Sequence, residues 1–84
     1  MAGVTVRYRG ALSDVTGVEE EDFNANTVRD ILKHIKTNYG ADAEKKAKSM
    51  LIAIDGESML LRDGFATVLA DGEVVQFLPI CGGG

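Results

Sequence analysis

The residues with the clearest chemical use lie at the end of the chain, where Cys81 precedes Gly82, Gly83 and Gly84. Glycine has no side chain and loses much conformational freedom on ordering, so a run of glycines does not stabilise a fold. A glycine peptide is, however, narrow enough to enter a slot that any larger residue would block. We therefore expect the carboxylate of Gly84 to be the reacting group. The alternatives are a frayed terminus or an expression remnant.

Composition limits the classes of protein to which the chain can belong. Its 84 residues suffice for one domain with one core, but not for a deep, enclosed active site. The formal net charge of −4 argues against a nucleic-acid-binding surface. No apolar run approaches the roughly 20 residues of a membrane span, and no signal peptide is apparent, so we expect a cytoplasmic protein. The single cysteine excludes an intramolecular disulfide and a CxxC metal site.

Hydrophobic periodicity predicts the elements that must position this glycine tail. Apolar and polar side chains alternate over residues 4–9, which is typical of a half-buried strand. Residues 11–17 predict a helical turn or a loop that ends at Gly17. Residues 18–23 are short and acidic, and they predict an edge strand whose charges discourage pairing with other chains.

The main helix is predicted over residues 28–39, because its apolar side chains form a single stripe at helical spacing. Thr27 is a suitable N-cap for this helix, and Gly40 stands just past its end. Asp42 is predicted to cap a second short helix over residues 43–48, with its charges in solvent.

The second half of the chain predicts three short strands. Residues 51–54 form the first, Asp55-Gly56 is a hairpin signal, and residues 59–61 form the returning strand. Asp71-Gly72 then turns the chain into the last strand, over residues 74–78. Together with the helix, these strands predict two layers, in which one helix packs on one face of a mixed sheet.

The two faces of the last strand can be separated by parity. Val75 and Phe77 share one face, whereas Gln76 and Leu78 share the other. A glutamine fits poorly in a tight apolar layer. Val75 and Phe77 should therefore be buried, which leaves Leu78 outside and close to the tail.

The order of these elements resembles the ubiquitin-like β-grasp fold, an α+β fold with a mixed four- to five-stranded sheet and one main helix packed on one face. The segment DGEVVQFLPICGGG is similar to the C-terminal signature of the MoaD family, within the MoaD/ThiS-like ubiquitin-like sulfur carriers. Counted from Asp71-Gly72, Pro79 falls on the family proline and Gly83-Gly84 on its terminal pair. Ile80 replaces a second proline that is common in the family. The resemblance implies a β-grasp domain over 1–80 and a flexible tail over 81–84.

The same resemblance implies a sulfur carrier that is not itself an enzyme. A MoeB/ThiF-like adenylating enzyme would use ATP to adenylate the Gly84 carboxylate. A sulfur donor protein would then supply the sulfur of a C-terminal thiocarboxylate, while Gly82, Gly83 and Gly84 thread the enzyme's pocket. A MoaE-like large synthase subunit would transfer the sulfur in molybdopterin biosynthesis. The carrier itself is expected to bind no cofactor and no metal.

A docking surface for these partners is predicted around the base of the tail. Leu78, Pro79 and Ile80 supply an apolar centre, and Arg7 and Arg9 are expected on the same exposed face of the sheet. The alternative is a set of isolated apolar side chains, which are normal on protein surfaces.

Other reactive side chains have an ordinary interpretation beside a functional one. Cys81 could form a disulfide with a partner or hold sulfur as a persulfide, but an incidental thiol is favoured. His34 is expected to be a solvated helix residue instead of a metal ligand or an acid–base group. The acidic run 19–22 is expected to be a solvated edge, although it could meet a basic groove or a metal. The helix lysines lack the interleaved aromatic residues of a nucleic-acid surface.

Two other functions remain open within the resemblance. The same tail would serve a ubiquitin-like protein modifier that is conjugated to lysines, or a ThiS-type carrier in thiamine thiazole synthesis. A phenylalanine, leucine and proline before the tail favour MoaD over ThiS. A ferredoxin-type electron carrier is excluded, because it would need four cluster cysteines.

Overall fold

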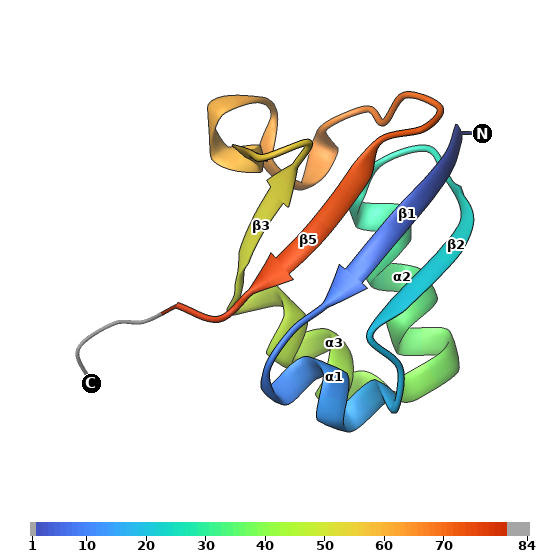
Figure 1. The fold of residues 1–84 in the computed structure, drawn as a ribbon, viewed down its shortest axis with the longest axis vertical. Coiled ribbons are helices and arrows are strands. Elements are labelled where there is room, and N and C mark those ends of the chain that lie inside the picture. Colours follow the sequence, from blue (N-terminus) through green and yellow to red (C-terminus); the bar gives the residue numbers. More distant parts are fainter. Residues whose placement is uncertain (1, 81–84) are drawn as a thin grey trace.

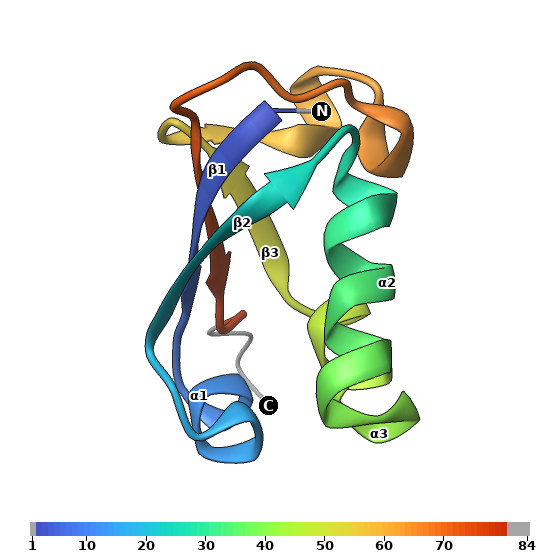
Figure 2. The same ribbon diagram turned by 90° about the vertical axis from the view of Figure 1, so that its right-hand side faces the viewer.

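The computed structural model describes residues 2–80 of the chain, in which helices cover one face of a five-stranded sheet. Figures 1 and 2 show this two-layer arrangement, with α2 and α3 on one side of the strands. The elements in chain order are β1 (Ala2–Tyr8), α1 (Ala11–Thr16), β2 (Glu20–Ala25), α2 (Val28–Tyr39), α3 (Ala41–Lys48), β3 (Leu51–Ile54), β4 (Glu57–Ser58), two 3₁₀ turns η1 (Met59–Leu61) and η2 (Gly64–Ala66), and β5 (Val74–Leu78).

The sheet has the strand order β2-β1-β5-β3-β4, with the last strand of the chain at its centre. β5 runs parallel to β1, with Tyr8 opposite Phe77, and antiparallel to β3, with Leu51 opposite Leu78. The other two pairs are antiparallel. This mixed sheet with its main helix on one face confirms the predicted β-grasp fold.

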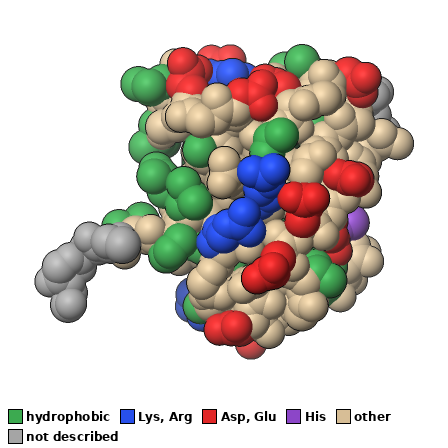
Figure 3. Space-filling model, in the orientation of Figure 1, with side chains coloured by type: hydrophobic (Ala, Val, Ile, Leu, Met, Phe, Trp, Pro, Cys, Tyr) green, Lys and Arg blue, Asp and Glu red, His purple; other side chains and the backbone are tan. Residues whose placement is uncertain are grey.

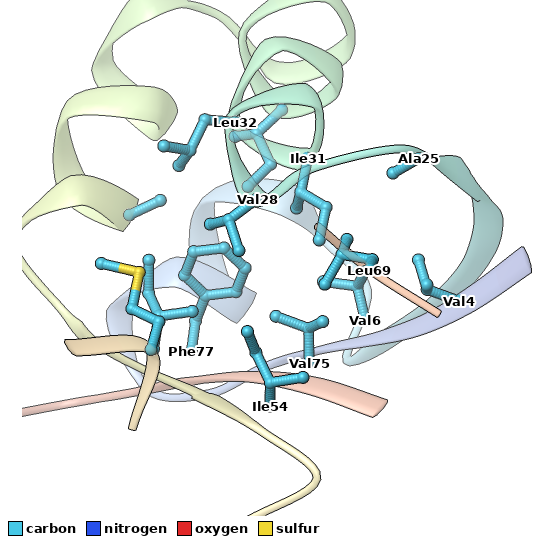
Figure 4. Close-up of a cluster of buried hydrophobic side chains, with 14 of the residues drawn as sticks. Val4, Val6, Ala25, Val28, Ile31, Leu32, Ile54, Leu69, Val75 and Phe77 are labelled. Carbon is cyan, nitrogen blue, oxygen red and sulfur yellow. The ribbon is translucent and has the colours of Figure 1, made fainter. Parts of the chain in front are cut away.

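The core lies between α2 and the central strands, as Figure 4 shows. A capping box starts α2: the Thr27 hydroxyl accepts from the Asp30 N–H, and the Asp30 carboxylate accepts from the Thr27 N–H at 3.0 Å. Ile31 and other apolar side chains of the predicted helical stripe are buried against the sheet. Val75 and Phe77 are 0% exposed, so the predicted faces of the last strand are correct.

The second helix differs from its prediction at the N-terminus. α3 begins at Ala41, directly after Gly40, and Gly40 is both the C-cap of α2 and the N-cap of α3. Asp42 therefore lies inside the helix and does not cap it. Gly40 adopts φ 100°, which a glycine tolerates, so the chain turns between the two helices at a single residue. Ala43 and Ala47 are buried, and they hold one side of α3 on the core.

The predicted returning strand at residues 59–61 is wrong. β4 contains only Glu57–Ser58, and the chain then enters the turns η1 and η2. The Arg62 guanidinium donates to Glu57 at 3.0 Å and to Glu73 at 3.1 Å, so it links this segment to the start of β5. Of the three apolar residues 59–61, Met59 alone is buried.

The acidic segment forms an edge strand as predicted, but it spans Glu20–Ala25 and begins later than residue 18. The Thr16 hydroxyl donates to the Val18 carbonyl at 2.9 Å and accepts from the Val18 N–H at 3.3 Å. These bonds keep Val18 in the turn after α1.

In the described part of the chain, residues 2–80, no helix combines the length and the apolar character that crossing a membrane requires.

Candidate functional site

The base of the predicted tail lies at the end of the central strand. β5 ends at Leu78, and Pro79 and Ile80 continue from it toward the C-terminus (Figure 1). The residues predicted to react or to relay sulfur, Cys81 and Gly82–Gly84, lie outside the described residues, as does the predicted tail boundary after residue 80. The structure therefore defines the support of the reacting group, and the role of the group itself stays a prediction.

The turn between β1 and α1 lies beside this base. A Cβ placed on Gly10 would be 3.6 Å from Cγ of Pro79, and Gly10 has φ 59°. Because that φ favours glycine, the turn can present a bare backbone to the proline ring. The Gly10 carbonyl also accepts from the backbone N–H and the hydroxyl of Ser13, at 3.1 Å and 2.8 Å, which anchors the turn to the first helix.

The predicted docking residues of β1 and β5 share the open face of the sheet. Arg7 lies opposite Gln76 in the parallel pair, so its side chain and those of Gln76 and Leu78 point away from the helices. Arg7 binds Glu20 at 3.0 Å, and the Arg9 guanidinium donates to the Tyr8 carbonyl at 3.2 Å. Arg7 is thus held on the open face by its strand, whereas Arg9 lies just past the end of β1.

The structure adds an apolar neighbour that the sequence did not indicate. Leu51 is 41% exposed and lies directly opposite Leu78 across the β3–β5 pair, while Ile80 is 65% exposed beyond the end of β5. Figure 3 views this face and shows hydrophobic side chains gathered near the end of β5, with Lys or Arg side chains beside them. The residues Leu51, Leu78 and Ile80, with Arg7 and Arg9, are called the sheet-face patch below.

Leu51 escaped prediction because β3 is apolar at every position, so its alternation cannot show which side faces solvent. The signal was indirect. Once Phe77 is assigned to the core, its cross-strand partner Ile52 must also face the core. Leu51, one residue earlier, then faces outward.

The acidic edge strand carries a cluster that was not predicted. Glu21 accepts hydrogen bonds from the hydroxyls of Tyr8, at 3.0 Å, and Tyr39, and it lies 2.9 Å from Nε2 of His34. The His34 ring stacks on Phe23 with 3.7 Å between centroids. The predictions of a solvated His34 and of a solvated edge at Glu21 are therefore wrong. Both side chains lie between β2 and α2, where the edge strand meets the helix.

Burial and charge alter the chemistry of this cluster. Burial raises the pKa of the Tyr8 phenol well above its usual value, and the Glu21 carboxylate raises that pKa further. Tyr8 therefore stays a hydrogen-bond donor at neutral pH. Within residues 2–80, no three His, Cys, Asp or Glu side chains are grouped as a metal site would require. The cluster serves to fasten the edge strand to α2.

The β-grasp fold and the comparisons with known proteins place the protein in the class of MoaD/ThiS-like ubiquitin-like sulfur carriers. Small archaeal modifier protein 1 from Methanosarcina acetivorans is similar over 100% of this chain and 98% of its own, with 26% identity and a TM-score of 0.83. A putative molybdopterin converting factor subunit 1 from Pyrococcus furiosus is similar over 94% of this chain and 98% of its own, with 24% identity and a TM-score of 0.71.

A chain in the complex of molybdopterin-converting factor subunits 1 and 2 from Helicobacter pylori also matches. It is similar over 96% of this chain and 99% of its own, with 25% identity and a TM-score of 0.66. Comparison with the sequences of curated proteins found no match. The chain belongs to the ThiS family, whose model matches residues 6–84.

Proposed function

We propose that this protein carries sulfur for the biosynthesis of molybdopterin, the organic part of the molybdenum and tungsten cofactors. In this proposal a MoeB/ThiF-like enzyme adenylates the carboxylate of Gly84 with ATP. A sulfur donor protein converts the adenylate into a thiocarboxylate, and a MoaE-like large synthase subunit passes the sulfur to a pterin precursor. The observation that carries the proposal is the direct passage from the buried central strand to a glycine tail.

The proposed reaction needs a tail long enough to enter the active site of another protein and a rigid domain from which the tail extends. A carboxylate is a poor electrophile until its oxygen attacks the α-phosphorus of ATP, which releases pyrophosphate and leaves an acyl-adenylate. Hydrosulfide delivered by the sulfur donor protein then attacks the carbonyl carbon, its proton is lost, and AMP leaves, which gives the thiocarboxylate. The tail must hold that carbon in a near-attack pose inside another protein. Gly82, Gly83 and Gly84 offer a narrow path, and the carrier needs no catalytic side chain of its own.

The central position of β5 supports this role. Its backbone pairs with β1 on one side and β3 on the other, and Val75 and Phe77 are fully buried. The tail is therefore proposed to start from one of the best-supported points of the sheet. A partner that binds the sheet-face patch would find the start of the tail at a defined place, which lowers the entropic cost of threading.

Two similarities support molybdopterin biosynthesis as the pathway. The order of phenylalanine, leucine and proline at residues 77–79 resembles MoaD more than ThiS. The similar chains from Pyrococcus furiosus and Helicobacter pylori are described as molybdopterin-converting factor proteins, the latter in a complex of two subunits. We infer that the sheet-face patch of this chain binds a large synthase subunit in a comparable assembly.

A second function is favoured by a different observation. The archaeal modifier protein is 26% identical to this chain, so conjugation of Gly84 to lysines of other proteins is the alternative proposal. A ThiS-type role in thiazole synthesis is a third outcome, suggested by the family itself. All three uses begin with the same activated carboxyl group and differ in the nucleophile that attacks it.

The deciding measurement is the mass of the protein isolated from its own cells, with fragmentation of the C-terminal peptide. Sulfur in place of one oxygen at Gly84 supports a carrier, whereas sulfur on Cys81 moves the chemistry to the thiol. Isopeptide bonds between Gly84 and lysines of other chains favour the modifier. Co-purification with a large synthase subunit then distinguishes molybdopterin from thiazole synthesis.

A further inference from the structure

The cationic side chains are concentrated on the helix layer. The segment from α2 to α3, residues 28–48, holds six of the nine Lys and Arg residues but only three of the thirteen Asp and Glu residues. The rest of the chain holds three cations and ten carboxylates. An acidic protein thus presents one basic surface, on the layer opposite the sheet-face patch.

A groove of about 530 Å³ lies within this basic surface, between α2, α3 and η2. Its apolar lining comes from Leu32, which is 3% exposed, and from Phe65, which packs partly against the core. Four cationic side chains line the same groove: Arg29, Lys33, Lys36 and Lys48. The groove therefore combines an apolar surface with several positive charges, a pairing that suits a ligand with both properties.

Most of these charges are not neutralised by the protein itself. Glu44 is the single carboxylate among the lining residues, and its oxygen lies 3.9 Å from Nζ of Lys48. Among residues 2–80, no carboxylate oxygen lies within 4.0 Å of a charged nitrogen of Arg29, Lys33 or Lys36. Three positive charges beside an apolar lining thus remain available to a partner.

The spacing of the charges indicates the shape of that partner. Arg29, Lys33 and Lys36 stand at i, i+4 and i+7 on one side of α2, so they span about 10 Å along the helix axis at 1.5 Å per residue. A single phosphate is compact and would meet only one or two of them. A row of carboxylates along a peptide would meet all three, and one apolar side chain could lie on Leu32 and Phe65.

We propose that the groove between α2 and α3 binds an acidic peptide segment of a partner protein through an apolar anchor. Nucleic acid fits less well, because Phe65 is the one aromatic residue in the groove and the whole protein carries a net charge of −4. The groove and the sheet-face patch lie on opposite layers, so both can be occupied at once. This inference does not depend on the proposed sulfur chemistry.

The test uses the full chain labelled with ¹⁵N and a defined probe, a twelve-residue peptide of alternating glutamate and leucine. Amide shifts should change in α2, α3 and η2, and the affinity should fall as salt is raised. A glutamate–serine peptide of equal length tests the apolar anchor, and a lysine–leucine peptide tests the charge. Both should bind at least about tenfold more weakly than the probe.

A matched pair of variants locates the site. Lys33→Glu with Lys36→Glu should weaken peptide binding about tenfold or more, because two attractions become repulsions. Lys45→Glu with Lys46→Glu changes the net charge equally on a helix of the same layer, but neither residue lines the groove. This control should change the affinity less than about twofold. Thermal unfolding followed by circular dichroism checks that both double variants fold.

Several results would overturn the proposal. They are shifts confined to the sheet face, equal weakening by the two double variants, or no shift at millimolar peptide in 50 mM salt. Binding of a single-stranded oligothymidylate to the same amides, without binding of the acidic peptide, would assign the groove to nucleic acid instead. Because none of these readouts requires an activated Gly84, failure here is separate from failure of the sulfur-carrier proposal.

Discussion

Adjacent residues of β5 should respond to substitution in opposite ways, because Phe77 faces the helices and Leu78 faces the open side of the sheet. Phe77 is 0% exposed, and its ring centroid lies 6.1 Å from that of Tyr8. Phe77→Ala removes most of a buried aromatic side chain and leaves a cavity, which typically costs about 3–5 kcal/mol. A chain of this size is stabilised by only about 4–13 kcal/mol in total, so the variant should unfold at a much lower urea concentration.

Leu78→Asp should instead spare the fold and weaken docking. Leu78 is half-buried beside Leu51 on the sheet-face patch, so the change should cost about 1 kcal/mol of folding stability, the centre of the range for single substitutions. If Leu78 lies at the centre of a partner interface, burying a carboxylate there should cost about 2 kcal/mol or more of binding, which is about thirtyfold in affinity.

Two assays separate these effects. Urea unfolding measures stability, and calorimetric titration with the adenylating enzyme measures docking. Val68→Asp is the matched control, because Val68 is 66% exposed and pairs with Thr27 at the start of α2, away from the base of the tail. If Leu78→Asp unfolds the protein while Phe77→Ala does not, the assignment of strand faces is wrong. If Leu78→Asp binds as tightly as Val68→Asp, the sheet-face patch is not the docking surface.

Three further predictions concern the tail and the Glu21 cluster. Amidation of the Gly84 carboxylate should abolish ATP–pyrophosphate exchange by the adenylating enzyme while leaving the amide spectrum of the domain unchanged, and full exchange by the amidated chain would contradict the terminal-carboxylate proposal. Glu21→Gln should cost about 1–3 kcal/mol in urea unfolding, because a charged acceptor shared by buried donors is lost. Glu20→Gln is its control: this residue is half-exposed and pairs with Arg7, so the expected cost is below about 1 kcal/mol, and an equal cost would show that the cluster adds nothing. Because the folded pKa of Tyr8 is raised, its contribution is present below the unfolded pKa near 10 and is lost as the pH rises above it, by about 1.4 kcal/mol per pH unit. Tyr8→Phe should remove that part of the alkaline slope, and an unchanged slope would assign it to another group.

Part of the candidate site was predictable because its elements obey local rules. The parity of Val75 and Phe77 depends only on the two-residue repeat of a strand, and it correctly left Leu78 outside. The position of Arg7 on the same face follows from the same repeat, once β1 and β5 are known to be neighbours. That neighbour relation came from resemblance to the β-grasp fold, since nothing local to either strand encodes it.

Residues 59–61 are apolar enough for a strand, but they form a 3₁₀ turn in which Met59 packs into a core built from distant parts of the chain, while Leu60 and Leu61 stay exposed. His34 lies outside the apolar stripe of α2, so the sequence predicted that its side chain is exposed to solvent. Phe23, eleven residues earlier in the chain, provides the ring on which it stacks.

The sequence by itself determined the main helix and the two faces of the last strand. The capping box at Thr27, the helical stripe that follows it, and the alternation of β5 all depend on residues within one turn or two positions of each other. Such interactions can be read from a short stretch of sequence, because both partners lie within it. The proposed chemistry of Gly84 belongs here too, because it rests on residue types at the end of the chain.

Only the tertiary structure decided which of these elements share a surface. It set Leu51 beside Leu78, closed Glu21 between two tyrosines and a histidine, and brought Phe65 to the groove that Leu32 lines between α2 and α3. Each case joins residues far apart in the chain. The physical reason is that packing selects among the many long-range pairings that local patterns allow, and that selection is a property of the whole core.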